Sequence, residues 1–133
     1  MSRSGYNDDC GGWDLIRWRG AVAQAIRGGR GQKLLRDMAA ALDAMPIKRL
    51  VSNSLEKDGE VCALGSVGKV RGIDMSVIDP EDREAVGKAF EIAPALAAEI
   101  ADQNDSLHWP KQTPEDRWSS MRKWVAEHLK EAK

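Results

Sequence analysis

The chain has 133 residues, which suits one domain of ordinary size and leaves no room for two. Apolar residues make up 42% and charged residues 31%, which argues against overall disorder, and the net charge of −1 excludes a uniformly basic coat protein for nucleic acid. No apolar run approaches the ~18 residues of a membrane span, and the N-terminus lacks the apolar core of a signal peptide. Two cysteines, Cys10 and Cys62, are too few for a disulfide scaffold, so we expect a cytoplasmic protein that has no contact with a membrane.

The first part of the chain predicts a flexible segment followed by a helix. Residues 1–11 are polar and show no periodicity, so we expect a flexible N-terminus, followed by a single helical domain over residues 12–133. A helix begins near Trp13, because apolar side chains then recur at spacings of three and four residues as far as Ile26.

A second helix is predicted after a run of glycines. Residues 28–31 (Gly-Gly-Arg-Gly) are expected to end the first helix, since glycine readily takes the left-handed conformation of a helix stop. The next apolar stripe predicts a helix from about Gln32 to Ala44. A loop this short predicts that the two helices pack antiparallel as an αα-hairpin.

The middle of the chain carries the signals of a β-hairpin instead of a long helix. Asp58-Gly59 is a preferred pair for a type I′ turn, so residues of about 49–64 predict a small β-hairpin that packs on the helices. Cys62 would then lie on an apolar strand as a small buried hydrophobe. Residues 65–72 predict a short helix that ends near its last glycine.

Two copies of Pro-Glu-Asp-Arg, at 80–83 and 114–117, predict two helix starts, because proline and acidic residues suit the first turn. Asp79 would cap the first of these helices, which should run to Asn104, and Thr113 precedes the last. An internal repeat is the alternative interpretation. We therefore predict an all-α, α-dominated fold: a single-domain bundle of four to five helices with one small β-hairpin.

The charge is unevenly distributed. Segment 17–49 holds eight basic residues against two acidic ones, whereas segment 79–105 holds eight acidic residues against two basic ones. Either the two segments lie together and partly neutralise each other, or one pole of the surface meets a charged partner.

No motif points to catalysis or to a cofactor. The glycines at 28–31 and 65–72 lack the spacing of a phosphate-binding loop or a dinucleotide fingerprint. His108 and His128 stand in no metal-ligand pattern, and no neighbouring base activates Cys62. The sequence predicts a non-enzymatic protein without metal or cofactor.

The five tryptophans outnumber one phenylalanine and one tyrosine. Trp18 and Trp118 lie on apolar stripes and are expected in the core, whereas Trp13 and Trp109 have no stripe to join. A loop tryptophan either closes the end of the core or offers an anchor to a partner. The predicted partner-binding residues follow from these observations and from the basic glycine-rich bend: Arg27, Arg30, Lys33 and Trp109.

Several stretches resemble small, uncharacterised helical proteins encoded by bacteriophages and prophages. The resemblance covers nearly the whole chain, and its most distinctive residues are Cys62-Ala-Leu-Gly65 and a helix that ends in Asn104-Asp105. It supplies no assigned activity and no catalytic residue. It implies a phage setting in the cytoplasm of a bacterial host.

A phage protein of this kind is expected to bind a host protein or nucleoprotein complex and to block or redirect it, and inhibitors of host immunity such as anti-CRISPR proteins belong to that class. The alternative is a nucleic-acid-binding accessory protein that uses the basic segment 17–49.

Overall fold

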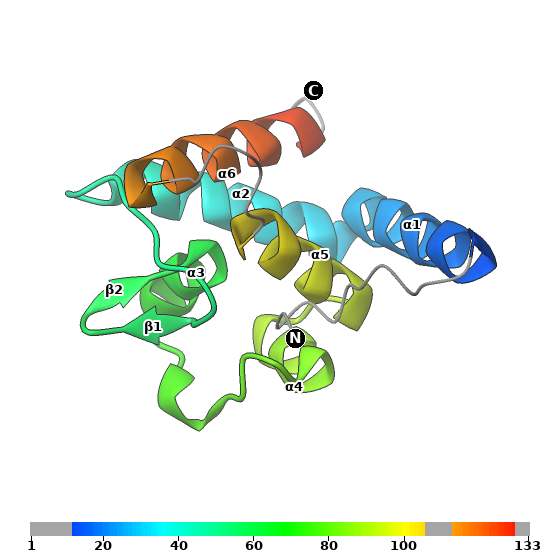
Figure 1. The fold of residues 1–133 in the computed structure, drawn as a ribbon, viewed down its shortest axis with the longest axis horizontal. Coiled ribbons are helices and arrows are strands. Elements are labelled where there is room, and N and C mark those ends of the chain that lie inside the picture. Colours follow the sequence, from blue (N-terminus) through cyan, green and yellow to red (C-terminus); the bar gives the residue numbers. More distant parts are fainter. Residues whose placement is uncertain (1–11, 106–112, 130–133) are drawn as a thin grey trace.

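A computed structural model describes residues 12–105 and 113–129. Within that part the fold is helix-dominated and all-α in class, with six α-helices and one two-stranded antiparallel sheet (Figure 1). The elements in chain order are α1 (Gly12–Arg27), α2 (Gly29–Ala44), β1 (Glu56–Lys57), β2 (Glu60–Val61), α3 (Ala63–Arg71), the 3-10 turn η1 (Met75–Val77), α4 (Arg83–Phe90), α5 (Pro94–Asp105) and α6 (Pro114–His128). The class agrees with the prediction, whereas four to five helices is too few.

The joint between α1 and α2 differs from the prediction. Only Gly28 separates the two helices, and its φ of −70° and ψ of 161° are extended rather than left-handed. Gly31 lies within α2, and the position requires glycine because a Cβ there would lie 2.0 Å from the carbonyl oxygen of Ala25. The joint therefore depends on close backbone approach. The predicted αα-hairpin is wrong, since α2 continues away from the end of α1 (Figure 1).

The β-hairpin is shorter than predicted. Positive φ angles at Asp58 (53°) and Gly59 (83°) confirm the turn, yet each strand has two residues. Cys62 lies on no strand; it is the N-cap of α3, which begins before the predicted residue 65. Val51 N–H still donates to the carbonyl oxygen of Val61, but Leu50 N–H donates to that of Pro114, so segment 49–55 forms single hydrogen bonds to β2 rather than a regular ladder over 49–64.

The predicted helix from Asp79 to Asn104 is two helices. Asp82, not Asp79, caps α4 by accepting hydrogen bonds from two backbone N–H groups in its first turn. Glu91 takes a left-handed φ of 60° and ends α4, and α5 then starts at Pro94. Leu96 and Ile100 of α5 are fully buried, so the predicted apolar face is correct even though the helix is interrupted.

Helix α6 begins as the sequence predicts. Thr113 and Asp116 form a reciprocal capping box around Pro114. Helix α6 runs antiparallel to α2, because Gln32 near the start of α2 bonds to His128 while the indole N–H of Trp118 donates to Leu42 at 3.2 Å. No helix in the described segments is long and apolar enough to cross a bilayer.

Helix α2 lies at the centre of the core. It contributes four fully buried side chains, and α1, α3 and α6 are the helices in closest contact with it (Figure 1). The four are Leu34, Leu35, Met38 and Leu42. Trp18 and Trp118, which the sequence predicts to lie in the core, are half-buried and pack against its edge.

Candidate functional site

Three of the four predicted partner-binding residues gather at the α1–α2 joint. Arg27 is the last residue of α1, and Arg30 and Lys33 lie in the first turns of α2; all three are exposed. Because α2 starts at Gly29, Arg30 and Lys33 are helical side chains rather than flanks of a loop, and a spacing of three residues makes them neighbours on the helix surface. The fourth residue, Trp109, lies outside the described residues.

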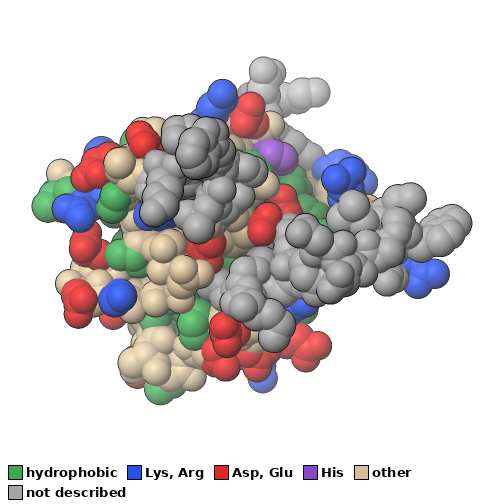
Figure 2. All heavy atoms as spheres, in the orientation of Figure 1, with side chains coloured by type: hydrophobic (Ala, Val, Ile, Leu, Met, Phe, Trp, Pro, Cys, Tyr) green, Lys and Arg blue, Asp and Glu red, His purple; other side chains and the backbone are tan. Residues whose placement is uncertain are grey.

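The cations of segment 17–49 differ in how they are engaged. Arg49 forms an ion pair with Glu60, with 2.8 Å between Nε and Oε1. Among the described residues, no acidic side chain lies within ion-pair distance of three exposed cations of α2: Arg30, Lys33 and Arg36. Figure 2 shows acidic side chains gathered over the lower part of one face, in the region of α4. The acidic segment therefore does not neutralise these three cations through ion pairs.

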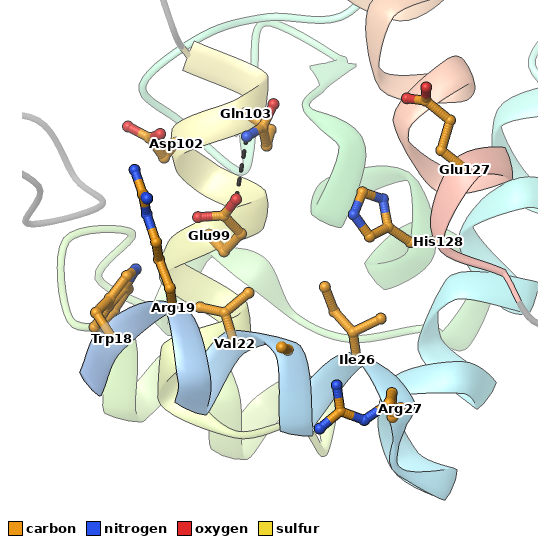
Figure 3. Close-up of a pocket in the computed structure, with 11 residues that line it drawn as sticks. Trp18, Arg19, Val22, Ile26, Arg27, Glu99, Asp102, Gln103, Glu127 and His128 are labelled. Atoms are coloured by element: carbon orange, nitrogen blue, oxygen red, sulfur yellow. Dashed lines mark hydrogen bonds between the residues drawn. The ribbon is translucent and has the colours of Figure 1, made fainter. Parts of the chain in front are cut away.

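A hollow of about 650 Å³ lies between α1, α5 and α6 (Figure 3). Val22 and Ile26 of α1 give it an apolar wall. Arg19 extends from α1 toward Asp102 of α5, so the polar groups that face the hollow carry both signs of charge (Figure 3). A lining with charges of both signs favours neither an anion nor a cation.

His128 contributes an imidazole side chain to the lining of this hollow. Its Nδ1 lies 2.8 Å from the carbonyl oxygen of Trp124, so Nδ1–H donates there and Nε2 is the acceptor in the neutral ring. The described lining contains no Ser, Thr, Cys or Lys side chain that His128 could activate as a nucleophile. Across the described residues, no three His, Cys, Asp or Glu side chains are placed to hold a metal ion.

The residues of the Cys62–Gly65 and Asn104–Asp105 stretches hold α3 in place. Cys62 Sγ accepts a hydrogen bond from the N–H of Gly65 at 3.3 Å, and a Cβ on Gly65 would lie 1.9 Å from the carbonyl oxygen of Leu55. Asn104 is fully buried, and its Oδ1 accepts the N–H of Ala63 at 3.1 Å. These residues join the start of α3 to α5, so their structural role accounts for the motif.

A second concave surface was not predicted. An apolar groove of about 520 Å³ lies between the C-terminal turn of α2, the following link, the β-turn and α3, and we call it the α2–α3 groove. Ile47 and Val70 line it and are 65% and 71% exposed. A signal for it was present in the sequence: Ile47 stands between Pro46 and Lys48, an apolar residue with no stripe to join.

The charges around the α2–α3 groove leave a small positive excess. The side chains of Arg49 and Glu60 pair with each other at one edge, and each is 41% exposed. Lys69 lines another part, where its Nζ lies 3.5 Å from the carbonyl oxygen of Gly59 and meets no acidic side chain of the described residues. The groove therefore combines an apolar surface with one uncompensated cation.

Comparison with known proteins identifies no relative: no family model, no curated protein and no solved structure matches this chain.

Proposed function

We propose that this chain is a non-enzymatic protein of a phage or prophage that binds a host protein through the α2–α3 groove. The observation that carries the proposal is the exposure of Ile47 and Val70 on the two sides of one apolar concavity. In the phage setting that the resemblance implies, such a protein blocks or redirects a host complex, as inhibitors of host immunity do.

Burial of these two side chains supplies the driving force. Moving a Val or Ile side chain fully out of water stabilises by about 1.5–3 kcal/mol, and each already has part of its surface buried. Removing both contacts should therefore weaken a complex by about 2–3 kcal/mol, which corresponds to a 30- to 150-fold loss of affinity, about tenfold for each 1.4 kcal/mol.

The groove favours a segment that presents an apolar side chain beside an acidic one. The apolar side chain would lie between Ile47 and Val70, and a carboxylate would meet Lys69, whose charge no described acidic side chain balances. The Arg49–Glu60 pair would stay at the rim, where an exposed pair contributes little affinity and helps to define orientation.

The test compares capture of bacterial host proteins by three purified forms of the full chain. One is the wild type, one carries Ile47→Gln and Val70→Gln, and the control carries Val77→Gln. Val77 is matched in type and is 79% exposed, but it lies on η1 and does not line the groove. Melting temperatures of all three forms should agree, because each change affects an exposed side chain.

The proposal predicts a host protein that wild type and Val77→Gln retain and that the groove variant loses, with Lys69→Glu weakening the same interaction. Capture that is equal for all three forms would overturn it. So would a dimer of this chain that sedimentation detects in the wild type and not in the groove variant, because the groove would then take a second copy.

A further inference from the structure

Four basic side chains follow one another at three-residue intervals across the α1–α2 joint: Arg27, Arg30, Lys33 and Arg36. We call them the basic ridge. All four are exposed, and the last three lie along the first two turns of α2. Arg27 also lines the hollow of Figure 3, and the other three cations continue from it along α2, at the opposite end of that helix from the α2–α3 groove.

Three cations elsewhere in the described chain have clear structural roles. Arg71 pairs with Asp37 at 2.7 Å, and Arg122 pairs with Asp43 at 2.8 Å. Arg117 is buried and donates to the carbonyl oxygen of Leu50. By contrast, Arg30, Lys33 and Arg36 hold no element in place, so the fold does not explain their charge.

The position of Arg30 opposes the stability of α2. A helix N-terminus carries partial positive charge, so acidic side chains stabilise the first turn and basic ones destabilise it. Helices α4 and α6 have acidic residues there, whereas α2 has none and places Arg30 in its first turn instead. Arg30 is thus an unfavourable charge for which no described contact compensates, which indicates that it serves binding rather than folding.

A recess adjoins the ridge, and Arg30 is the charged residue of its described lining. Its volume is about 440 Å³, and small residues from α1, the joint and the start of α5 line it, among them Gly28, Gly29 and Pro94. A chain that contacts the ridge could thus approach the backbone closely at the exposed glycines of the joint.

We propose that the basic ridge binds the phosphodiester backbone of a nucleic acid. Successive cations three residues apart on a helix rise by about 4.5 Å, so several can reach neighbouring phosphates of one strand. A lipid surface fits less well, because the large exposed apolar side chains of the described residues, Ile47, Val70 and Val77, lie elsewhere. The ridge contacts backbone rather than base edges, so the binding is expected to be independent of sequence.

The test measures fluorescence anisotropy of a labelled DNA duplex of about 20 base pairs, the matching single strand and an RNA of the same sequence, with polyglutamate as a polyanion without phosphate. Three to four phosphate contacts predict that duplex affinity falls about 40- to 150-fold between about 50 and 200 mM salt. Lys33→Gln should lower the slope of log K against log salt by about one. Lys88→Gln is the matched control, an exposed helical lysine of α4 in the acidic segment, and should leave the slope unchanged.

Arg30→Glu separates binding from folding, because the two effects have opposite signs. It should reduce affinity for the preferred nucleic acid at least tenfold while raising the melting temperature by about 2–5 °C, since it replaces an unfavourable charge at the start of α2 with a favourable one. A lower melting temperature would mean that Arg30 is structural and would overturn the proposal. Absence of salt-dependent binding, equal binding of polyglutamate, or unchanged binding by Arg30→Glu would overturn it as well.

The variants of the α2–α3 groove leave the ridge intact, so failure of either proposal is distinguishable from failure of the other.

Discussion

The side-chain amide of Gln32 donates a hydrogen bond of 3.1 Å to the carbonyl oxygen of His128, which lies 96 positions later in the chain. The same nitrogen lies 2.7 Å from the carbonyl oxygen of Ile26. Both carbonyls belong to the last turns of helices, where no helical N–H reaches them. One buried amide thus satisfies the ends of α1 and α6 and holds the start of α2 between them.

Gln32→Ala should destabilise the protein by about 2–3 kcal/mol, because it removes both hydrogen bonds and leaves polar groups without partners beside a buried site. Urea denaturation monitored by circular dichroism measures the change. Gln24→Ala on the exposed face of α1 is the control and should stay within about 0.5 kcal/mol of the wild type. Equal midpoints for the two variants would contradict the role assigned to Gln32.

Gly31→Ala and Gly29→Ala should have opposite effects. A methyl group on Gly31 meets the carbonyl oxygen of Ala25 at 2.0 Å, so the joint must open, at a cost of about 3 kcal/mol or more. Gly29 lies in α2 with open space around its Cβ position, so alanine should stabilise the protein by about 0.5–1 kcal/mol through helix propensity. Thermal melts of both variants check this pair, and a tolerated Gly31→Ala would refute the close approach.

Asn104→Ala should cost about 2–4 kcal/mol. The buried Asn104 amide accepts from Ala63 N–H and donates to the carbonyl oxygen of Val51 at 2.9 Å, so its loss leaves two backbone groups unsatisfied. Gln103→Ala, next to it but half-buried, should cost less than about 1 kcal/mol. If Asn104→Ala melted normally and lost partner binding instead, the Asn-Asp motif would be a binding element rather than a structural one.

The ion pair of Asp43 and Arg122 should contribute stability above about pH 4. Hydrogen bonds from the Arg122 guanidinium lower the pKa of Asp43 below its ordinary value of 3.8. A lowered pKa in the folded state means that the contribution is present above the unfolded-state pKa and disappears as pH falls through the folded one. Asp43 is exposed, so a double-mutant cycle of Asp43→Asn and Arg122→Gln should give a coupling of about 0–1 kcal/mol at pH 7 and none well below pH 3.8. A coupling that persists in acid would exclude the ion pair as its source.

The sequence by itself determined the caps and turns that are formed by residues close together in the chain. The Thr113–Asp116 capping box and the Asp58–Gly59 turn formed where the sequence predicts them, since each rests on residues at most three positions apart. The same reasoning misplaced the cap of α4, because Asp79 and Asp82 are both suitable caps. Asp82 is the cap in the structure, whereas Asp79 accepts a hydrogen bond from Glu81 within the preceding turn.

Tertiary contacts decided the features that join distant residues. Helix α2 starts at Gly29 rather than at Gln32, because Gly31 packs on Ala25 and Gln32 bonds across 96 positions to α6. The exposed cations of the basic ridge could be predicted, since exposure follows from their place off the apolar stripe. The α2–α3 groove could not, because Ile47 and Val70 come to line one surface only after the β-turn and α3 fold against the end of α2. A concave surface is made by the packing of several elements, and no periodicity within one element encodes it.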